Sequence, residues 1–465
     1  MSRPTVSFVS LGCPKNLVDS EKMLGLLAEA GCAVVGAGGD ADVMVVNTCG
    51  FLAASRDEAV AVLREAAQRK RRGDLRGIVA AGCLVQRDGD GLMEDVPEID
   101  GLVGVNDRES IVHAVLEAAR SNRPASAERT VFLGEYHAQS WSDRARLRLT
   151  PRHYAYLRMS EGCDQKCTFC TIPSIRGTML CKPVEEIIAE ARELIADGAV
   201  EINLIGQDTT SYRSPAAADH PAFAGRDGTI DLAGLLRTLN RIDGVGWLRL
   251  MYAYPSDFTD EMIDALAESD RVVKYVDMPL QHINDRVLKA MHRRVTRRQT
   301  ETLLEKLRKR VPGVSIRTTF IAGFPGETGA EFEELRRFVA DFKFEMVGVF
   351  PYSLEPETPA GRMKRQLADK IKKNRVAALM ETQQAVVFER NRRERGRTME
   401  VMIDGFGRDG VYPARHAGQA PEIDSVTQVE GGEFDPGEFV RVRVTGSRDY
   451  DLRARPVGMG LPVLR

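Results

Sequence analysis

The stretch CDQKCTFC, residues 163–170, sets three cysteines in eight positions and guides the interpretation of the whole chain. Cys163, Cys167 and Cys170 have the spacing of a metal-binding loop, whereas a tetrahedral metal site needs four ligands. One interpretation is zinc, with a remote Cys or His as the fourth ligand. The other is an iron–sulfur cluster held by three thiolates, which leaves one iron open. Phe169 stands between two of the cysteines and would shield a cluster, which favours the second interpretation.

Length and composition limit the class of protein. A chain of 465 residues is too long for one core and predicts about three domains. The formal net charge of −2 gives no overall electrostatic case for nucleic acid or an anionic membrane. No apolar run approaches the roughly 18 residues of a membrane span, and no signal peptide precedes the first strand-like stretch. We therefore expect a cytoplasmic protein whose eight cysteines are thiols or metal ligands.

Six short apolar runs after residue 150 alternate with amphipathic segments. Six successive β/α units predict an open (β/α)6 barrel, TIM-like but not closed, over residues 149–380. The cysteine loop follows its first strand, at the end of the barrel where functional residues gather. The predicted strands are Tyr154–Met159, Val200–Leu204, Gly246–Met251, Lys274–Met278, Val314–Ile321 and Met346–Phe350, and the helices between them include Val184–Ala196 and Thr328–Phe342.

The segments on either side differ from this core. Residues 4–120 predict a parallel α/β domain, and residues 121–148 are interpreted as a linker. The charged stretch 362–397 predicts a solvated connecting helix. Residues 382–460 are expected to form a third domain, whose fold is a small antiparallel β-barrel. The N-terminal strands are Thr5–Ser10, Asp42–Asn47 and Gly77–Ala81, with helices Asp19–Ala30 and Ser55–Arg72, and the barrel strands are Met399–Ile403, Gly410–Ala414, Phe439–Thr445 and Tyr450–Pro456.

Three further cysteines repeat one placement in the N-terminal domain. Each follows a predicted strand and has a glycine neighbour, which would let the backbone bend around something bulky. Because parallel strands end at one edge of a sheet, the three thiols can converge there, and we interpret them as ligands of a second cluster. Any one of them alone could be an ordinary buried cysteine, which is our interpretation of Cys32. The three are Cys13, Cys49 and Cys83, beside Gly12, Gly50 and Gly82.

The residues CDQKCTFC resemble the signature of the radical S-adenosylmethionine superfamily. The resemblance implies a [4Fe–4S] cluster whose open iron is chelated by the amino and carboxylate groups of S-adenosylmethionine. It also implies that glycine or polar residues at later strand ends contact this cofactor, since glycine permits close approach of a ligand. The matching residues, beside Phe169, are Gly206, Gln207, Asp208, Gln281 and Gly323, the last of which opens the stretch Gly323–Glu327.

Two sites of three cysteines followed by a small β-barrel resemble the methylthiotransferases over nearly the whole chain. That family has an N-terminal cluster domain, a radical core and a C-terminal TRAM domain, and it attaches a methylthio group to an unactivated carbon. The resemblance implies two [4Fe–4S] clusters and an electron donor. The core cluster would generate a 5′-deoxyadenosyl radical, the auxiliary cluster would hold the sulfur, and a second S-adenosylmethionine would supply the methyl group.

Two branches of this family differ in substrate. The MiaB-like branch modifies a tRNA adenosine beside the anticodon, and the other modifies the β carbon of an aspartate in the twelfth small-subunit ribosomal protein. The first branch typically has Gln-Met-Asn after its first cysteine, whereas this chain has Pro14-Lys15-Asn16. This tripeptide and ARHAGQAPEID, residues 414–424, resemble the second branch. We therefore expect a small-subunit ribosomal protein or the ribosome as partner of a monomer, in preference to tRNA.

Charge gives an independent argument for the ribosomal protein. Residues 398–465 contain 8 Arg, no Lys and 11 Asp plus Glu, a net charge of −3. A barrel that grips RNA is expected to be basic, whereas a mildly acidic barrel suits a basic protein. Ordinary variation of a protein surface would also produce this small value, so the charge favours one branch without deciding between them.

The chain departs from the family pattern after Arg176-Gly177, where Cys181-Lys182 stands in place of the usual Ser-Arg. Lysine keeps the charge but loses the bidentate guanidinium, so a carboxylate contact made there would be weakened. Cys181 could compete as a cluster ligand, and Ser425 replaces a usual glycine. An alternative from another class is a non-enzymatic, zinc-stapled scaffold that binds ribosomal components, which metal content would distinguish.

Overall fold

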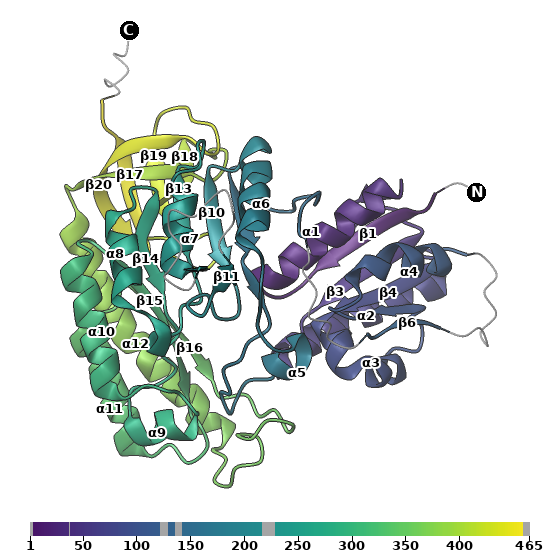
Figure 1. Cartoon of the computed structure of the whole chain (residues 1–465), viewed down its shortest axis with the longest axis horizontal. Helices are drawn as coiled ribbons and strands as arrows, with labels where there is room; N and C mark the ends of the chain where they lie inside the picture. Colours follow the sequence, from purple (N-terminus) through teal and green to yellow (C-terminus); the bar gives the residue numbers. More distant parts are fainter. Residues whose placement is uncertain (1–2, 37, 121–128, 135–141, 216–227, 459–465) are drawn as a thin grey trace.

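The computed structural model describes residues 3–36, 38–120, 129–134, 142–215 and 228–458. Figure 1 shows an N-terminal α/β unit on one side, a larger central α/β unit, and a small β-barrel, coloured yellow, at the C-terminal end of the chain. Separate clusters of buried apolar side chains fill these units. No helix among the described residues combines the length and apolar character that crossing a membrane requires.

A six-stranded parallel sheet forms the N-terminal unit, in the order β2-β1-β3-β4-β5-β6. Strand β3 is buried along its whole length because helices cover both faces of the sheet. Strand β6 lies within the expected linker 121–148, so this part of the prediction is corrected. The elements are β1 (Thr5–Ser10), α1 (Pro14–Glu29), β2 (Ala33–Val35), β3 (Val43–Thr48), α2 (Ala53–Arg72), β4 (Gly77–Gly82), α3 (Cys83–Asp95), β5 (Gly101–Val103), η1 (Arg108–Ser110), α4 (Ile111–Ala118) and β6 (Thr130–Phe132).

The central unit is a second parallel sheet of six strands, in the order β16-β15-β14-β13-β10-β7. The order follows the chain without reversal and the sheet does not close, as predicted for an open (β/α)6 barrel. All six predicted strands are present within two residues of their expected bounds. They are β7 (Tyr154–Arg158), β10 (Glu201–Ile205), β13 (Trp247–Leu250), β14 (Val272–Asp277), β15 (Ser315–Ala322) and β16 (Met346–Pro351).

Helices and short strands connect the six core strands. Two of the helices begin with a capping box, in which the side chains of Thr296 and Thr328 accept the free N–H groups of the first turn. The connecting elements are β8 (Ser160–Glu161), α5 (Ile172–Arg176), β9 (Leu180–Cys181), α6 (Val184–Ala196), β11 (Arg213–Pro215), β12 (Thr229–Asp231), α7 (Leu232–Leu239), η3 (Pro255–Asp257), α8 (Asp260–Glu268), α9 (Asp285–Ala290), α10 (Arg297–Arg310) and α11 (Gly329–Phe342).

The last helix, α12 (Asp369–Glu394), is more than a connector. It packs against β16 and α11, and Leu379, Gln383 and Val387 on its inner face are buried. The amide of Gln383 donates to the carbonyl of Phe344 at 3.0 Å. The helix therefore covers the end of the core sheet, which corrects the expectation of a solvated connecting helix.

The C-terminal unit is a closed five-stranded barrel, in the order β17-β18-β19-β21-β20. Neighbouring strands are antiparallel except β19 and β21, which run parallel. Strand β19 has only four residues and shows no clear alternation in the sequence. The strands are β17 (Thr398–Ile403), β18 (Val411–His416), β19 (Thr427–Glu430), β20 (Phe439–Arg448) and β21 (Asp451–Pro456).

The segment 414–424 of this barrel contacts the first residues of β7 and β10 and the middle of β14. Arg415 donates to Glu201 at 2.7 Å, and the Tyr154 hydroxyl donates to Glu422 at 2.8 Å. The Tyr275 hydroxyl donates to Asp424, also at 2.8 Å. The barrel thus caps the amino ends of the core strands, whereas the cysteine loop follows a carboxyl end. In Figure 1 the yellow barrel lies beyond one end of the core strands, and α5 lies toward the other end.

Candidate functional site

Three cysteines lie on the loop between β8 and α5, and we call Cys163, Cys167 and Cys170 the core triad. Backbone bonds shape this loop, with Cys163 N–H donating to Gly177 and Cys170 N–H donating to Cys167, each at 3.2 Å. Burial is the main cause that raises the pKa of the Cys163 and Cys170 thiols to about 12, and Cys167 acts on both. The three cysteines are partly exposed and close enough to influence each other.

No three Cys, His, Asp or Glu side chains of the described residues converge closely enough to hold a single metal ion. In a [4Fe–4S] cluster each thiolate binds a different iron, so the ligands surround the cluster and need not meet at one point. The core triad therefore fits a cluster better than a preformed zinc site.

Orphaned polar atoms gather around the core triad. Among the described residues, buried side-chain atoms without a hydrogen-bond partner include Ser160 Oγ after β7 and Gln207 Oε1 after β10. Tyr254 OH and Ser256 Oγ, both after β13, belong to the same class. Because buried polar groups are almost always hydrogen-bonded, such a concentration indicates the binding of a polar ligand. The carboxyl ends of the core strands thus fit a polar cofactor beside the cysteines.

Two residues expected to contact the cofactor contact other residues of the chain instead. Asp208 accepts hydrogen bonds from Gln165 at 2.8 Å and from the Thr210 and Ser211 hydroxyls at 2.7 Å, so it closes the cysteine loop. A Cβ added to Gly323 would lie 2.6 Å from Lys372 Cγ, so the close packing of α12 is a sufficient reason for a glycine at this position.

The other expected contacts remain compatible with a cofactor. A Cβ on Gly206 would lie 2.6 Å from Ser160 Oγ, so only a glycine leaves room here for this unpaired hydroxyl. Gln281 adopts a left-handed backbone with φ of 70° and forms a bridge with Phe320 of β15. Phe169 packs against a buried apolar cluster that contains Phe324.

A second group of thiols, which we call the N-terminal triad, comprises Cys13, Cys49 and Cys83 after β1, β3 and β4. Gly12 has φ of +93°, and a Cβ added to it would lie 2.8 Å from Cys49 Cβ. A Cβ on Gly50 would lie 2.9 Å from the backbone carbonyl carbon of Cys83. The glycines therefore let the three loops approach each other closely.

Electrostatic interactions agree with a close placement of the three thiols of the N-terminal triad. Burial raises the pKa of the Cys83 thiol to about 12, Arg176 opposes this shift, and Cys13 and Cys49 add to it. Burial likewise raises the pKa of Cys49, and Cys13 contributes. Cys32 is buried in the core of the sheet, as expected. Three thiols from three strand ends thus face one small volume, which fits a tri-thiolate cluster site.

Arg176, at the end of α5, connects the two triads. Its Nη2 and Nε donate to the sulfur of Cys83 at 3.1 and 3.3 Å, and Nη1 donates to Glu161 at 2.9 Å. It also donates to Asp19 of α1 at 2.8 Å. Since α5 directly follows the core triad, this side chain joins the core to the N-terminal triad and thereby connects the two domains. No local pattern around Arg176 indicates its distant partners, so the sequence alone does not predict its role.

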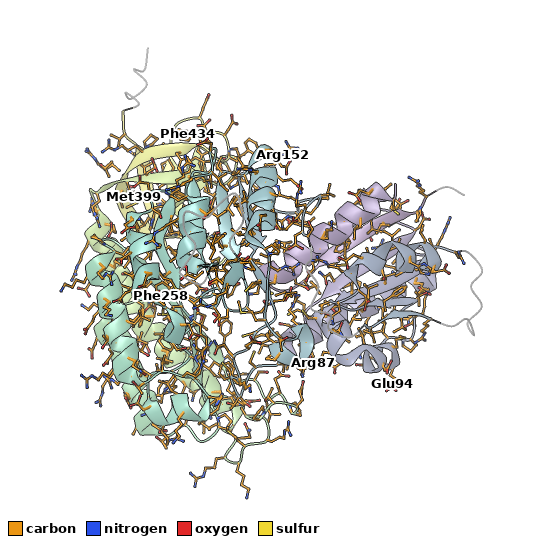
Figure 2. All side chains as sticks on the ribbon, in the orientation of Figure 1. Arg87, Glu94, Arg152, Phe258, Met399 and Phe434 are labelled. Atoms are coloured by element: carbon orange, nitrogen blue, oxygen red, sulfur yellow. The ribbon has the colours of Figure 1, made fainter. Side chains whose placement is uncertain are left out.

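A network of buried ion pairs surrounds this contact. Asp19 accepts hydrogen bonds from Arg158 at 2.7 Å and from Arg108 at 3.1 Å, in addition to Arg176. Burial alone would raise the pKa of Asp19, but these three arginines hold it below its usual value. A second junction joins Arg87 of α3 to Glu355 after β16 at 2.8 Å, and Figure 2 shows Arg87 where the N-terminal unit meets the core.

Lys182, the residue that departs from the family pattern, belongs to the same network. Its ammonium is fully buried, donates to Asp143 at 2.9 Å and also contacts Glu190. It therefore retains two carboxylate contacts as a point charge, without the fork of an arginine. Its neighbour Cys181 lies on β9, where its sulfur accepts the N–H of Arg213 at 3.4 Å.

The tripeptide Pro14-Lys15-Asn16 forms the first turn of α1, which begins five residues before the predicted helix. Asn16 donates to the carbonyls of Leu11 at 2.6 Å and Thr48 at 3.3 Å, and so joins two loops of the N-terminal triad. Lys15 extends toward the core, and its ammonium lies 3.2 Å from the centroid of the Tyr252 ring. In this tripeptide Asn16 therefore has a structural role, and Lys15 places a cation at the domain junction.

Arg293 is a residue of the site that the sequence analysis missed. Its Nη1 donates to Cys167 Sγ at 3.6 Å, and its guanidinium lies over the Tyr254 ring at 3.9 Å. Arg293 follows α9, more than a hundred residues after the cysteines. No spacing rule connects such distant positions, so only the fold identifies the contact.

The charges of the small barrel are separated rather than uniformly acidic. Exposed arginines line β20 and β21, and Arg443 lies directly opposite Arg455. Arg453 and Arg455 lie within 3.7 and 3.3 Å of Glu430, which is therefore not a free acidic group. The net charge of −3 thus conceals a basic face, and the argument from net charge does not hold for the barrel as a whole.

Sequence comparisons agree with this architecture. The Radical SAM superfamily matches residues 157–339, the Uncharacterized protein family UPF0004 matches residues 5–104, and the TRAM domain matches residues 396–457. Solved structures share the fold at low identity. The radical S-adenosylmethionine methyltransferase TsrM from Kitasatospora setae, with cobalamin and a [4Fe–4S] cluster bound, superimposes with a TM-score of 0.55 at 18% identity, covering 78% of this chain and 77% of TsrM.

Curated relatives are similar over nearly the whole chain. The ribosomal protein uS12 methylthiotransferase RimO of Anaeromyxobacter sp. (strain K) is 43% identical over 96% of this chain and 92% of its own length. The RimO proteins of Bdellovibrio bacteriovorus and Geobacter sulfurreducens are 41% and 40% identical, covering 96% and 97% of this chain and 96% and 98% of their own lengths. Identity and coverage at this level show that the chain belongs to the RimO family of radical SAM methylthiotransferases.

Proposed function

We propose that the protein attaches a methylthio group to the β carbon of an aspartate in ribosomal protein uS12. The observation that carries this proposal is the presence of two thiol triads on two domains, joined by the contact between Arg176 and Cys83. An enzyme that removes a hydrogen atom at one site and delivers sulfur from another needs both sites to reach the same carbon. Membership of the RimO family supports the choice of reaction and of substrate.

Two [4Fe–4S] clusters and S-adenosylmethionine are the cofactors of this proposal. Cys163, Cys167 and Cys170 would hold one cluster, which with S-adenosylmethionine would supply radical chemistry for removing a hydrogen atom, and Cys13, Cys49 and Cys83 would hold the other, which would carry the sulfur. The chain itself binds and orients the cofactors and the substrate, and it excludes water from them. Arg293 donates to Cys167 in the core triad, Arg176 donates to Cys83 in the N-terminal triad, and Gln207 offers an unpaired oxygen to a polar ligand.

We assign residues 4–120 to the auxiliary cluster, residues 149–380 to the radical core and residues 382–460 to the TRAM unit, although α12 crosses the last boundary and packs on the core as far as Val387. The protein acts as a monomer with a separate electron donor. Its barrel contacts the ribosomal partner away from the reacting carbon, because it caps the amino ends of the core strands and the core triad follows a carboxyl end.

Modification of a tRNA adenosine is the second candidate function, and the barrel's basic face favours it. Exposed arginines lie along β20 and β21, and those not already close to Glu430, such as Arg443, would attract an anionic partner. Metal analysis of anaerobically purified protein tests the shared chemistry, with about eight irons expected. A colourless protein that contains zinc would instead indicate a scaffold.

A further inference from the structure

Lys15 is a buried cation without an ion-pair partner among the described residues. Only 7% of the residue is exposed, and its ammonium lies over the Tyr252 ring, 3.2 Å from the centroid. No carboxylate in the described part of the chain lies within ion-pair distance of it. A buried charge is costly unless it is paired, and a contact with an aromatic face offsets only part of this cost. The ammonium therefore has unused capacity for an anion.

The neighbouring carboxylates are already bound by other groups. Asp277 accepts from Arg317 at 2.8 Å and from the N–H of Tyr252 at 3.1 Å. Glu161 accepts from Arg176 at 2.9 Å and from Gln207 at 2.5 Å. Neither carboxylate can approach Lys15 without giving up these bonds. Burial lowers the pKa of Lys15, and the thiol of Cys13, a proposed cluster ligand, opposes this shift more than Asp277 and Glu161 do. A carboxylate that pairs directly with the ammonium must come from outside this set.

The position of Lys15 limits which anion that is. It follows Cys13 by two residues, on the first turn of α1, and so adjoins the N-terminal triad. Tyr252, beneath the ammonium, follows β13 at the same end of the core sheet as the core triad. Its backbone is left-handed, with φ of 59°, a strained conformation that Asp277 supports through its bond to the Tyr252 N–H. Lys15 thus faces the junction between the two candidate cluster sites.

We propose that Lys15 binds the side-chain carboxylate of the aspartate that is modified. This inference rests on the proposed function. In aspartate the carboxylate carbon is bonded directly to the β carbon, so an ammonium that holds the carboxylate keeps the β carbon beside the N-terminal triad. The same contact selects aspartate over asparagine, because a neutral amide does not compensate a buried ammonium.

The test measures discrimination between two forms of the substrate. Purified uS12 from the same organism, with its native aspartate or with that aspartate changed to asparagine, is titrated into cluster-reconstituted enzyme in the presence of S-adenosylmethionine. Wild-type enzyme should bind the native form about ten-fold more tightly or better, the effect of losing one charged hydrogen bond. Lys15→Met should bind both forms equally, at the weaker level. Lys22→Met, on the same helix but bonded to the carbonyl of Arg144, is the matched control and should keep the wild-type preference.

Iron content and the electron paramagnetic resonance spectrum of each variant separate substrate binding from support of the cluster. The proposal is supported if Lys15→Met loses the preference for aspartate over asparagine while its iron content and spectrum are unchanged. Lys15→Arg should keep that preference. A Lys15→Met enzyme that still prefers aspartate would overturn the proposal, and so would a preference lost only together with iron. Failure of the wild-type enzyme to modify uS12 at all would instead refute the proposed function.

Discussion

The guanidinium of Arg176, from the radical core, donates two hydrogen bonds to the sulfur of Cys83, from the N-terminal domain, at 3.1 and 3.3 Å. This contact places a fixed positive charge against one ligand of the proposed auxiliary cluster. Hydrogen bonds to cluster sulfurs and nearby positive charge are among the factors that set the reduction potential of an iron–sulfur cluster. The geometry therefore connects domain docking with the chemistry of the N-terminal triad.

Arg176→Met is expected to make the reduction potential of the N-terminal cluster more negative, because a cation and two donors are lost. It should also lower the free energy of unfolding by about 3–5 kcal/mol, the range for removing one partner of a buried ion pair, because Arg176 is buried and paired with Asp19 and Glu161. A redox titration followed by electron paramagnetic resonance measures the first effect, with the core cluster of the same sample as the control. An N-terminal cluster with the wild-type potential would show that the contact has no electronic role.

Replacing each triad by alanine should separate the two parts of the reaction. Without the core triad, the protein should retain about four irons and form no 5′-deoxyadenosine. Without the N-terminal triad, it should also retain about four irons and form 5′-deoxyadenosine, yet transfer no methylthio group. Iron analysis and chromatography of the products provide the measurements. Wild-type iron in either variant would mean that the altered cysteines are not ligands.

Arg415 should anchor the barrel on the core, because it bridges Glu201 of β10 and Asp404 after β17. Arg415→Met leaves these carboxylates without that partner, and we expect a loss of about 3–5 kcal/mol in the free energy of unfolding. Arg441→Met changes an exposed arginine of the same barrel and should alter it by no more than about 0.5 kcal/mol. Equal effects in denaturant titrations of the two variants would contradict the anchoring role.

His416 should make stability depend on pH. Burial and the surrounding arginines Arg390 and Arg249 lower the pKa of His416 to about 3 in the folded protein. Below its ordinary pKa of about 6.5 the unfolded chain binds a proton that the folded chain does not, so stability falls as pH decreases from 6.5 toward 3. The slope is at most about 1.4 kcal/mol per pH unit.

Thermal unfolding between pH 7 and pH 5 should therefore show a smaller pH dependence in His416→Gln than in the wild type. Glutamine still offers an acceptor to the Gly418 N–H, which donates to the His416 ring at 3.0 Å. His113→Gln, at an exposed position of α4, is the control and should behave as the wild type does. Identical pH profiles for His416→Gln and the wild type would exclude His416 as the source.

The sequence predicted the elements whose information is local. The six core strands and helices such as α6 have the periodicity and capping signals of their class, and each cysteine loop follows a strand. Strands of three or four residues, such as β2 and β19, are too short to show a period. Contacts such as that of Arg293 with Cys167 join residues far apart in the chain, and only the fold brings them together. Lys15 was quoted as a family pattern, but its unpaired ammonium is visible only in the structure.

The sequence of the small barrel likewise does not predict where its charges lie or what its residues contact. Its net charge of −3 is a sum over faces of opposite sign, since arginines line β20 and β21. The segment 414–424 has the family pattern, yet it contacts Glu201, Tyr154 and Tyr275 of the core. A pattern in the sequence therefore identified the family here without indicating what the residues touch.

The most direct test of the central claim offers one preparation of reconstituted enzyme two substrates in parallel, namely uS12, free or in small ribosomal subunits, and undermodified tRNA. Mass spectrometry then detects an added methylthio group. We predict that uS12 gains the group on a single aspartate and that the tRNA remains unchanged. Modified tRNA with unmodified uS12 would contradict the assignment of substrate and leave the two-cluster chemistry in place.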